Sequence, residues 1–301
     1  MAMPPCRPRA ARMALYAAQV EDIWDNQIKG RPAAAMPSLP GWDVLGQLRA
    51  DDDLDLAQSL RSAFNLPQDV CFYGLLLRRA DGGDPDFDKG DYLAMVRGTG
   101  SNKEWFLDAC AFPEKLKAAA ARPGGLVPAG FHSIYQSMVY IDAGGADRGP
   151  AAHALSDVVA LADKPLTVVG HSLGAALVAY LAYDLATPPV PCSKVNSYMF
   201  ASPNPGDAGF AAAVKQNVQQ YTVVNWSCDV VPKLPPVPFC PLLNNAAAGG
   251  SQVVAVMSPA DLVGAWAPKD CPTCNHHAVC YARMLDPDNA AAKAQTQDYC
   301  C

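Results

Sequence analysis

Charge is scarce in this sequence. Lys, Arg, Asp and Glu make up only 17% of the 301 residues, and the formal net charge of −6 leaves no basic excess. Proteins that bind nucleic acid carry clustered positive charge, so the composition argues against a nucleic-acid partner. Half of the residues are hydrophobic. A chain of this length buries roughly three quarters of the surface that it exposes when unfolded, so we expect one domain with a large core.

Long uninterrupted apolar segments are also missing. The N-terminal stretch MAMPPCRPRAARMALYAAQ carries three prolines where a secretory signal needs a continuous apolar segment, and no cleavable signal is predicted. The compartment therefore stays open between export without a recognisable signal and the cytoplasm. Residues 166–186 reach the length of a membrane span, but His171, Ser172 and Asp184 interrupt them. We predict no transmembrane segment.

Cysteine, in contrast, is abundant. The chain has 11 cysteines, an odd number that cannot all pair within it, and most of them lie after residue 220. Cys271, Cys274, His276 and Cys280 resemble half of a zinc site, but a second ligand pair at the usual spacing is missing. We therefore predict no metal, and a C-terminal loop that is either braced by disulfides or reduced.

The order of apolar patterns indicates an α/β fold. A helix over 12–28 precedes two strands, 70–79 and 91–96, which are joined by turn residues and form a hairpin. Helices and β-branched strands then alternate, which predicts a mostly parallel central sheet with an antiparallel start and helices on both faces. We expect a single domain over 1–301, with a helical N-terminal extension over about 1–65 and a Cys-rich segment over about 240–301. The expected later helices are 131–143, 151–162, 173–186, 208–218 and 276–285, and the expected later strands are 166–169, 195–200, 221–226 and 252–257.

The stretch LTVVGHSLGAALVAY places a serine between two glycines at the end of a strand. Gly170-His-Ser-Leu-Gly174 fits the pattern G-x-S-x-G, in which a tight turn from strand to helix exposes a nucleophilic serine. The motif is short enough to arise by chance, and an ordinary turn between strand and helix is the alternative. The β-branched residues before it and the helix-forming residues after it favour Ser172 as a nucleophile.

A nucleophilic serine needs a histidine base and a carboxylate that orients the base. Asp229 follows the expected strand 221–226, on a loop at the edge of the sheet where such sites assemble. The histidines after Ser172 are His276 and His277, and the residues alone leave open which is the base. The backbone N–H of Leu173 is one expected oxyanion donor, and the Gly-rich loop 98–100 is the expected source of a second.

Several blocks between residues 70 and 235 resemble the class 3 lipases, the fungal-type triacylglycerol lipases with their plant and bacterial relatives. NHHAVCYARML further resembles the His-x4-Tyr start of the family's last helix, and this spacing selects His276. The chain departs from the family pattern at Val96, where phenylalanine is common, and at Ala201, where glycine is common. The blocks are YLAMVRGTGSNKEWFLD, GLVPAGFHSIYQS, LTVVGHSLGAALVAYLA, SYMFASPNPGDAGFA and YTVVNWSCDVVPKLPP.

The resemblance implies an α/β-hydrolase fold and a serine esterase that needs no cofactor. It implies that Ser172 is the nucleophile, that His276 is the base and that Asp229 orients the base. Thr99 and Leu173 would form the oxyanion hole. The substrate would be an acyl-ester lipid, an acylglycerol above all, met at a lipid–water interface.

The family often covers its site with a short lid, which here would span about residues 102–113. Trp105, Phe106 and Phe112 would face lipid or acyl chain there, and the alternative is that these aromatics pack in the core. Three other functions stay open within or beside this interpretation. They are a phospholipase, including a toxin-like effector, an acyltransferase on the same scaffold, and a lipid-binding protein without catalysis. We interpret the chain as a bacterial member of the family.

Overall fold

The protein is described from a computed structural model. It describes residues 7–28, 36–51, 70–81, 84–98, 119–160, 164–187, 194–244, 252–262, 266–268 and 272–299. Thr99 and the expected lid over 102–113, with Trp105, Phe106 and Phe112, lie outside these ranges.

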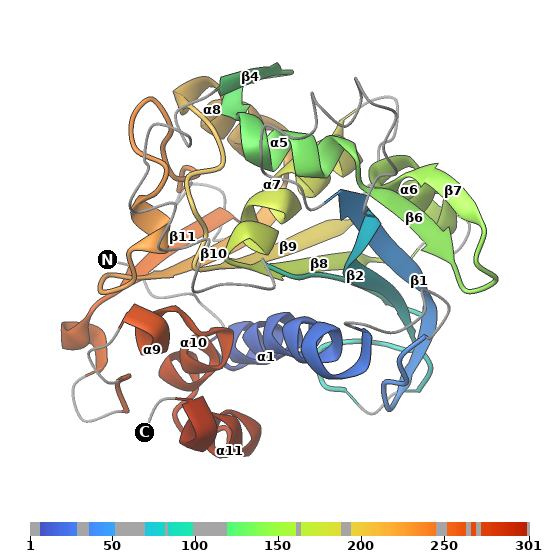
Figure 1. The fold of residues 1–301 in the computed structure, drawn as a ribbon. Coiled ribbons are helices and arrows are strands. Elements are labelled where there is room, and N and C mark those ends of the chain that lie inside the picture. Colours follow the sequence, from blue (N-terminus) through green and yellow to red (C-terminus); the bar gives the residue numbers. More distant parts are fainter. Residues whose placement is uncertain are drawn as a thin grey trace.

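A mixed nine-stranded sheet runs through the described part of the chain (Figure 1). Its strand order is β11-β10-β9-β8-β3-β2-β1-β6-β7. The pairs β3–β8, β8–β9, β9–β10 and β10–β11 are parallel. The pairs β3–β2, β2–β1, β1–β6 and β6–β7 are antiparallel. The bounds are β1 Trp42–Asp51, β2 Val70–Arg79, β3 Tyr92–Val96, β6 Val139–Asp142, β7 Asp147–Pro150, β8 Leu166–His171, β9 Val195–Phe200, β10 Gln220–Trp226 and β11 Gln252–Met257.

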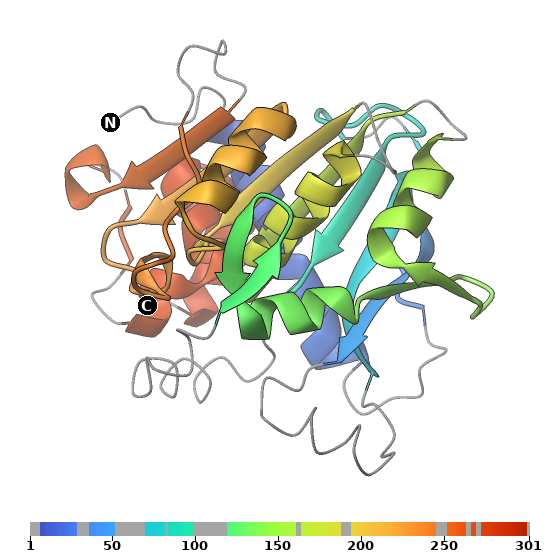
Figure 2. The same cartoon turned by 90° about the horizontal axis from the view of Figure 1, so that it is seen from above.

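Helices cover both faces of the sheet, as expected for a parallel sheet whose strands are buried on both sides. Every position of β3 and β8 is buried. On one face lie α5 Ala129–Gln136, α6 Ala151–Ala160, α7 Leu173–Ala186 and α8 Ala208–Asn217, and Figure 2 shows α7 between α6 and α8. On the other face lie α1 Arg7–Ile23 and α10 Ala278–Leu285, flanked by α9 Pro272–His276 and α11 Ala290–Tyr299 (Figure 1). The predicted α/β-hydrolase class is confirmed.

Smaller elements complete the described chain. The hairpin of β4 Ala119–Arg122 and β5 Gly125–Pro128 forms a separate two-stranded sheet. A π-helical turn, Trp24–Ile28, extends α1, and two 3-10 turns, Val231–Lys233 and Pro259–Leu262, follow β10 and β11.

Three predicted elements differ from the structure. Residues 42–51, placed by the prediction in a helical N-terminal extension, form β1, which lies between β2 and β6 in the main sheet. The helix expected over 131–143 ends at Gln136, and β6 follows it after Ser137 caps the helix. The helix expected over 276–285 is divided at His277 into α9 and α10, and α11 follows as an additional helix.

Candidate active site

Ser172 occupies a strained turn between β8 and α7. Its backbone angles are φ 57° and ψ −130°, a conformation that residues with a side chain rarely adopt. The flanking glycines are required by space. A Cβ atom on Gly170 would lie 2.4 Å from the carbonyl oxygen of Gly174, and one on Gly174 would lie 2.4 Å from that of Val96. The local geometry is therefore that of a nucleophile elbow.

The ring of His276 bridges Ser172 and Asp229. Nε2 lies 2.9 Å from the Ser172 Oγ, and Nδ1 lies 2.9 Å from the Asp229 Oδ2. The carboxylate can only accept, so Nδ1–H donates to it and Nε2 is left to accept from the serine hydroxyl. In this tautomer the imidazole can take the hydroxyl proton when the oxygen attacks a carbonyl carbon.

Asp229 is buried, and three donors meet its carboxylate. Besides His276, the Tyr281 hydroxyl donates to Oδ2 over 2.8 Å and the Val231 backbone N–H donates to Oδ1 over 2.9 Å. The Trp226 backbone N–H in turn donates to the Tyr281 oxygen over 3.0 Å. Burial, with the nearby Asp229 charge, raises the pKa of Tyr281 well above its ordinary value, so the hydroxyl keeps its proton and donates.

The three side chains come from loops at one edge of the sheet. Ser172 follows β8, and Asp229 follows β10. His276 is the last residue of α9, and His277 is the N-cap residue of α10. The structure thus brings His276, the histidine selected by the spacing to Tyr281, into contact with both Ser172 and Asp229.

The loop after β3 reaches the same turn. The buried Arg97 guanidinium lies 4.4 Å from the ring centres of Trp24 and Tyr73 and donates to the Gly98 carbonyl over 2.7 Å. Gly98 lies so close to the elbow that an added Cβ would be 3.3 Å from the Cβ of Ser172. Leu173 opens α7, where backbone N–H groups have no acceptor within the helix. Gly98 and Leu173 therefore both lie beside Ser172.

His171, next to the serine, makes different contacts. Its Nδ1 lies 2.9 Å from Oε1 of Glu21, and its Nε2 lies 2.5 Å from the backbone carbonyl oxygen of His276. Both ring nitrogens of His171 are thus engaged by Glu21 and the His276 backbone, so His171 is not placed to act as the base for Ser172. Sequence reasoning missed Glu21, because one glutamate on an amphipathic helix carries no signal of a site 150 residues further along the chain.

The zinc alternative is disfavoured by the same geometry. Both ring nitrogens of His276 face Asp229 and Ser172, and Cys280 is in a disulfide. Across the described ranges, no three His, Cys, Asp or Glu side chains are grouped to hold a metal ion.

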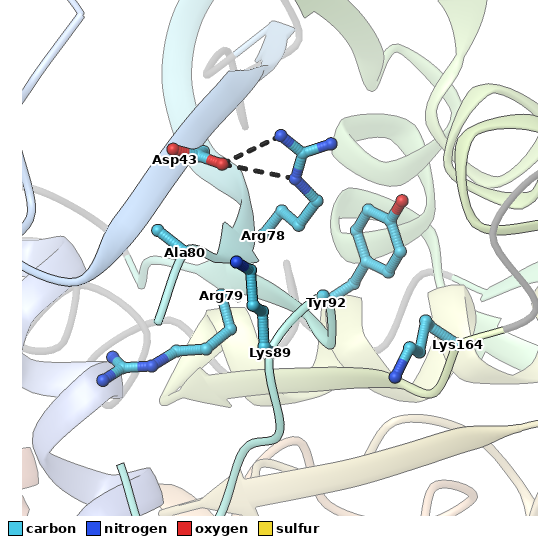
Figure 3. Close-up of a pocket in the computed structure, with 8 residues that line it drawn as sticks. Asp43, Arg78, Arg79, Ala80, Lys89, Tyr92 and Lys164 are labelled. Atoms are coloured by element: carbon cyan, nitrogen blue, oxygen red, sulfur yellow. Dashed lines mark hydrogen bonds and ion pairs between the residues drawn. The ribbon is translucent and has the colours of Figure 1, made fainter. Parts of the chain in front are cut away.

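A cavity of about 330 Å³ lies at the opposite edge of the sheet, beside the start of β3 and β8 (Figure 3). Basic residues dominate its lining, and some are paired: Arg78 donates to Asp43, and Arg79 forms an ion pair with Asp81. The elbow serine lies beyond the other end of β8, so this cavity is not part of the candidate active site. It is lined by Asp43, Arg78, Arg79, Ala80, Lys89, Gly90, Tyr92 and Lys164.

Comparison with protein families gives a match over the region that carries the elbow and Asp229. Residues 93–239 match the family described as lipase (class 3). The matched region, which is just under half of the chain, is that of a class 3 lipase. The sequence is 32% identical over 194 residues to phospholipase A1-II 7 of Oryza sativa subsp. indica, covering 55% of this chain and 46% of that protein. It is 28% identical over 215 residues to the chloroplastic galactolipase DONGLE of Arabidopsis thaliana, covering 65% of this chain and 43% of the relative.

The chain therefore spans less than half the length of these two curated relatives. Among solved structures, the lipase from Rhizopus microsporus var. chinensis matches with a TM-score of 0.54 at 18% identity, covering 79% of this chain and 72% of that one. That likeness supports the fold. The two relatives come from plants and the solved Rhizopus structure comes from a fungus, so the comparisons lend no support to a bacterial origin. In the described ranges, no helix has both the length and the apolar character needed to cross a bilayer.

Proposed function

We propose that this protein is a serine carboxylester hydrolase that cleaves lipid acyl esters through an acyl-enzyme. The observation that carries the proposal is the His276 ring, which bridges the Ser172 hydroxyl and the Asp229 carboxylate in a chain whose residues 93–239 match the class 3 lipases.

In the first half-reaction, the Ser172 Oγ attacks the ester carbonyl carbon while His276 Nε2 takes the hydroxyl proton. The oxygen of the tetrahedral intermediate accepts hydrogen bonds from the backbone N–H of Leu173 and from Thr99, the proposed second donor. One such donor contributes about 10²–10³ in rate. His276 then gives the proton to the leaving alcohol, and Asp229 stabilises the charged imidazole in between. Water, activated by the same histidine, hydrolyses the acyl-enzyme in the second half-reaction.

The test of this mechanism is Ser172→Ala with p-nitrophenyl esters as substrates. Loss of the nucleophile is expected to lower kcat by at least about 10⁴-fold while the circular dichroism spectrum and Tm stay those of the wild type. Turnover at the wild-type rate in a pure Ser172→Ala preparation would exclude the mechanism.

The base is tested by a matched pair of adjacent variants. His276→Ala is expected to cost about as much activity as Ser172→Ala, because the residues of a triad act as one unit. His277→Ala is the control, since it changes the adjacent histidine and leaves in place the His276 ring that bridges Ser172 and Asp229. Equal losses in both variants would remove His276 from its proposed role.

The head group of the substrate is a finer proposal. Acylglycerols are the first candidate, and the lid expected over 102–113, with Trp105, Phe106 and Phe112, would meet the lipid surface. Glycerophospholipids and galactolipids are the second candidate, favoured by the relatives named phospholipase A1 and galactolipase. Initial rates on diacylglycerol, phosphatidylcholine and monogalactosyldiacylglycerol, each in the same mixed micelles, separate these classes. Alcohol acceptors added to the same assay reveal acyl transfer as a product other than the free acid.

A further inference from the structure

A chain of polar contacts leads from the N-terminal helix to the backbone of the proposed base. Glu21 lies near the end of α1, and its Oε1 is 2.9 Å from Nδ1 of His171. On the other side of the ring, Nε2 is 2.5 Å from the carbonyl oxygen of His276. The His171 side chain is 2% exposed and that of Glu21 is 22% exposed, so the contact is shielded from solvent.

The nature of the two partners fixes the protonation of His171. A carboxylate and a backbone carbonyl can only accept hydrogen bonds. A neutral imidazole carries one N–H, so it would turn a nitrogen lone pair toward one of these two oxygens. Only the imidazolium form donates to both. The geometry therefore calls for a positive charge on His171, balanced by the negative charge of Glu21.

The surrounding charges agree with this assignment. Burial alone would lower the pKa of His171, but the Glu21 charge and hydrogen bond, helped by Asp229 and the His276 carbonyl, outweigh burial and raise it. Burial alone would raise the pKa of Glu21, and His171, with smaller contributions from His276 and His277, outweighs burial and lowers it.

The hydrogen bond to the His276 carbonyl lies where the helical structure is interrupted. His276 ends α9, and α10 begins after His277, so the helical hydrogen-bond pattern is interrupted at this point. The rings of His171 and His276 are 4.7 Å apart between centroids. A charge-assisted donor at the His276 carbonyl restrains the backbone from which the base projects toward Ser172.

We propose that Glu21 and His171 are positioning residues for this site: Glu21 holds His171 as an imidazolium, which clamps the His276 backbone in register with Ser172. The inference rests on the proposed function, because it assumes that His276 is the base. It also makes α1 part of the working site.

The protonation state is tested on the wild-type enzyme by long-range 1H–15N NMR of the imidazole nitrogens, with the His171 signals assigned by their loss in His171→Gln. Both nitrogens of His171 are expected to carry protons at neutral pH. In Glu21→Gln, which keeps the shape but removes the charge, one proton is expected to be lost. A neutral His171 in the wild type, or an imidazolium that persists in Glu21→Gln, overturns the proposal.

The functional arm measures the rate at which a fluorophosphonate modifies Ser172, together with kcat and KM on p-nitrophenyl butyrate. Glu21→Gln is expected to lower the modification rate and kcat about tenfold with little change in KM, because a charge-assisted bond is replaced by a weaker one. Asp22→Asn is the control, since Asp22 is exposed on the same helix and bonds Asn26.

The outcomes of these kinetic measurements distinguish failure of the proposed function from failure of the positioning role. A wild-type enzyme that neither reacts with the fluorophosphonate nor turns over esters would refute the proposed function itself. A reactive wild type whose Glu21→Gln variant reacts equally fast would leave that function standing and refute the positioning role. A slower Glu21→Gln that is fully folded at the assay temperature, together with an unaffected Asp22→Asn, supports it.

Discussion

Asp229 is held by three donors, and only one of them is the histidine that it orients. Tyr281 supplies the second and connects the carboxylate to the backbone of Trp226, while Val231 supplies the third from the loop itself. A buried carboxylate with several fixed donors cannot rotate, so the orientation of His276 depends on residues that never meet the substrate.

Tyr281→Phe is expected to lower kcat/KM about tenfold, which corresponds to about 1.4 kcal/mol of lost transition-state stabilisation. It is also expected to lower the free energy of unfolding by about 1–3 kcal/mol, because the buried Trp226 N–H loses its acceptor. Ester hydrolysis and urea denaturation measure the two effects. An unchanged kcat/KM in a folded variant would show that two donors suffice for Asp229.

The Glu21–His171 pair predicts how stability depends on pH. Glu21, with a lowered folded pKa, stabilises the fold above its unfolded pKa of about 4.3, and this is lost as the pH falls through the folded value. His171, with a raised folded pKa, stabilises the fold below its unfolded pKa of about 6.5, and this is lost as the pH rises through the folded value.

The wild type should therefore exceed Glu21→Gln in free energy of unfolding most clearly between about pH 4.3 and 6.5, and the gap should narrow on both sides. Urea denaturation of both proteins over a pH series checks this. A gap of constant size across the series would show that the pair contributes packing alone.

At the scale of elements, the strong patterns were predictable and the weak ones were not. The strands β8, β9 and β10 and the helix α7 were predicted within a few residues, because continuous β-branched or apolar runs mark them. β4 and β7 have the sequences AAAR and DRGP, which carry no strand pattern, and they pair only because neighbouring backbone is available. β1, WDVLGQLRAD, mixes polar and apolar residues and gains its place from two partner strands.

The same distinction applies to the candidate site. Ser172, Asp229 and His276 each stand in a local pattern, and their catalytic roles remain proposals that the observed contacts support. Glu21 belongs to no local sequence pattern, because its contact with His171 arises only from the packing of α1 against the sheet. Leu173 was placed by its position after the serine, while Thr99 lies outside the described residues.

α1 approaches the sheet and α10 closely because its inner face is built from small residues. Ala11, Ala14 and Ala17 are completely buried. Ala14→Leu is expected to cost about 1–3 kcal/mol of stability by overpacking this contact. Asp22→Leu, exposed on the same helix, is the control, and thermal unfolding measures both. Equal Tm values for the two variants would mean that α1 can shift without penalty.

At the scale of the whole molecule, one face of the sheet is covered by the two ends of the described chain. α1 comes from the N-terminal part and α10 from the C-terminal part, and they pack against each other beneath the sheet (Figure 1). Cys280 lies within α10, next to Tyr281, and is in a disulfide.

Cys280→Ala is expected to lower stability by about 2–4 kcal/mol, the usual contribution of a disulfide, and to lower activity because α10 carries Tyr281. Dithiothreitol should lower the Tm of the wild type in the same direction. Cys228→Ala is the matched control, since Cys228 is an exposed free thiol. If reduction leaves the Tm of the wild type unchanged, the disulfide does not hold α10 in place.

The contact between Glu21, His171 and His276 also sets the order in which the proposed site is completed during synthesis. Glu21 and His171 are 150 residues apart, and His171 and His276 are 105 residues apart. Glu21 is therefore synthesised long before His276. A nascent chain that already displays the Ser172 turn still lacks His276, the proposed base. Under the proposed mechanism, the Ser172 turn therefore stays without its base until residue 276 has left the ribosome.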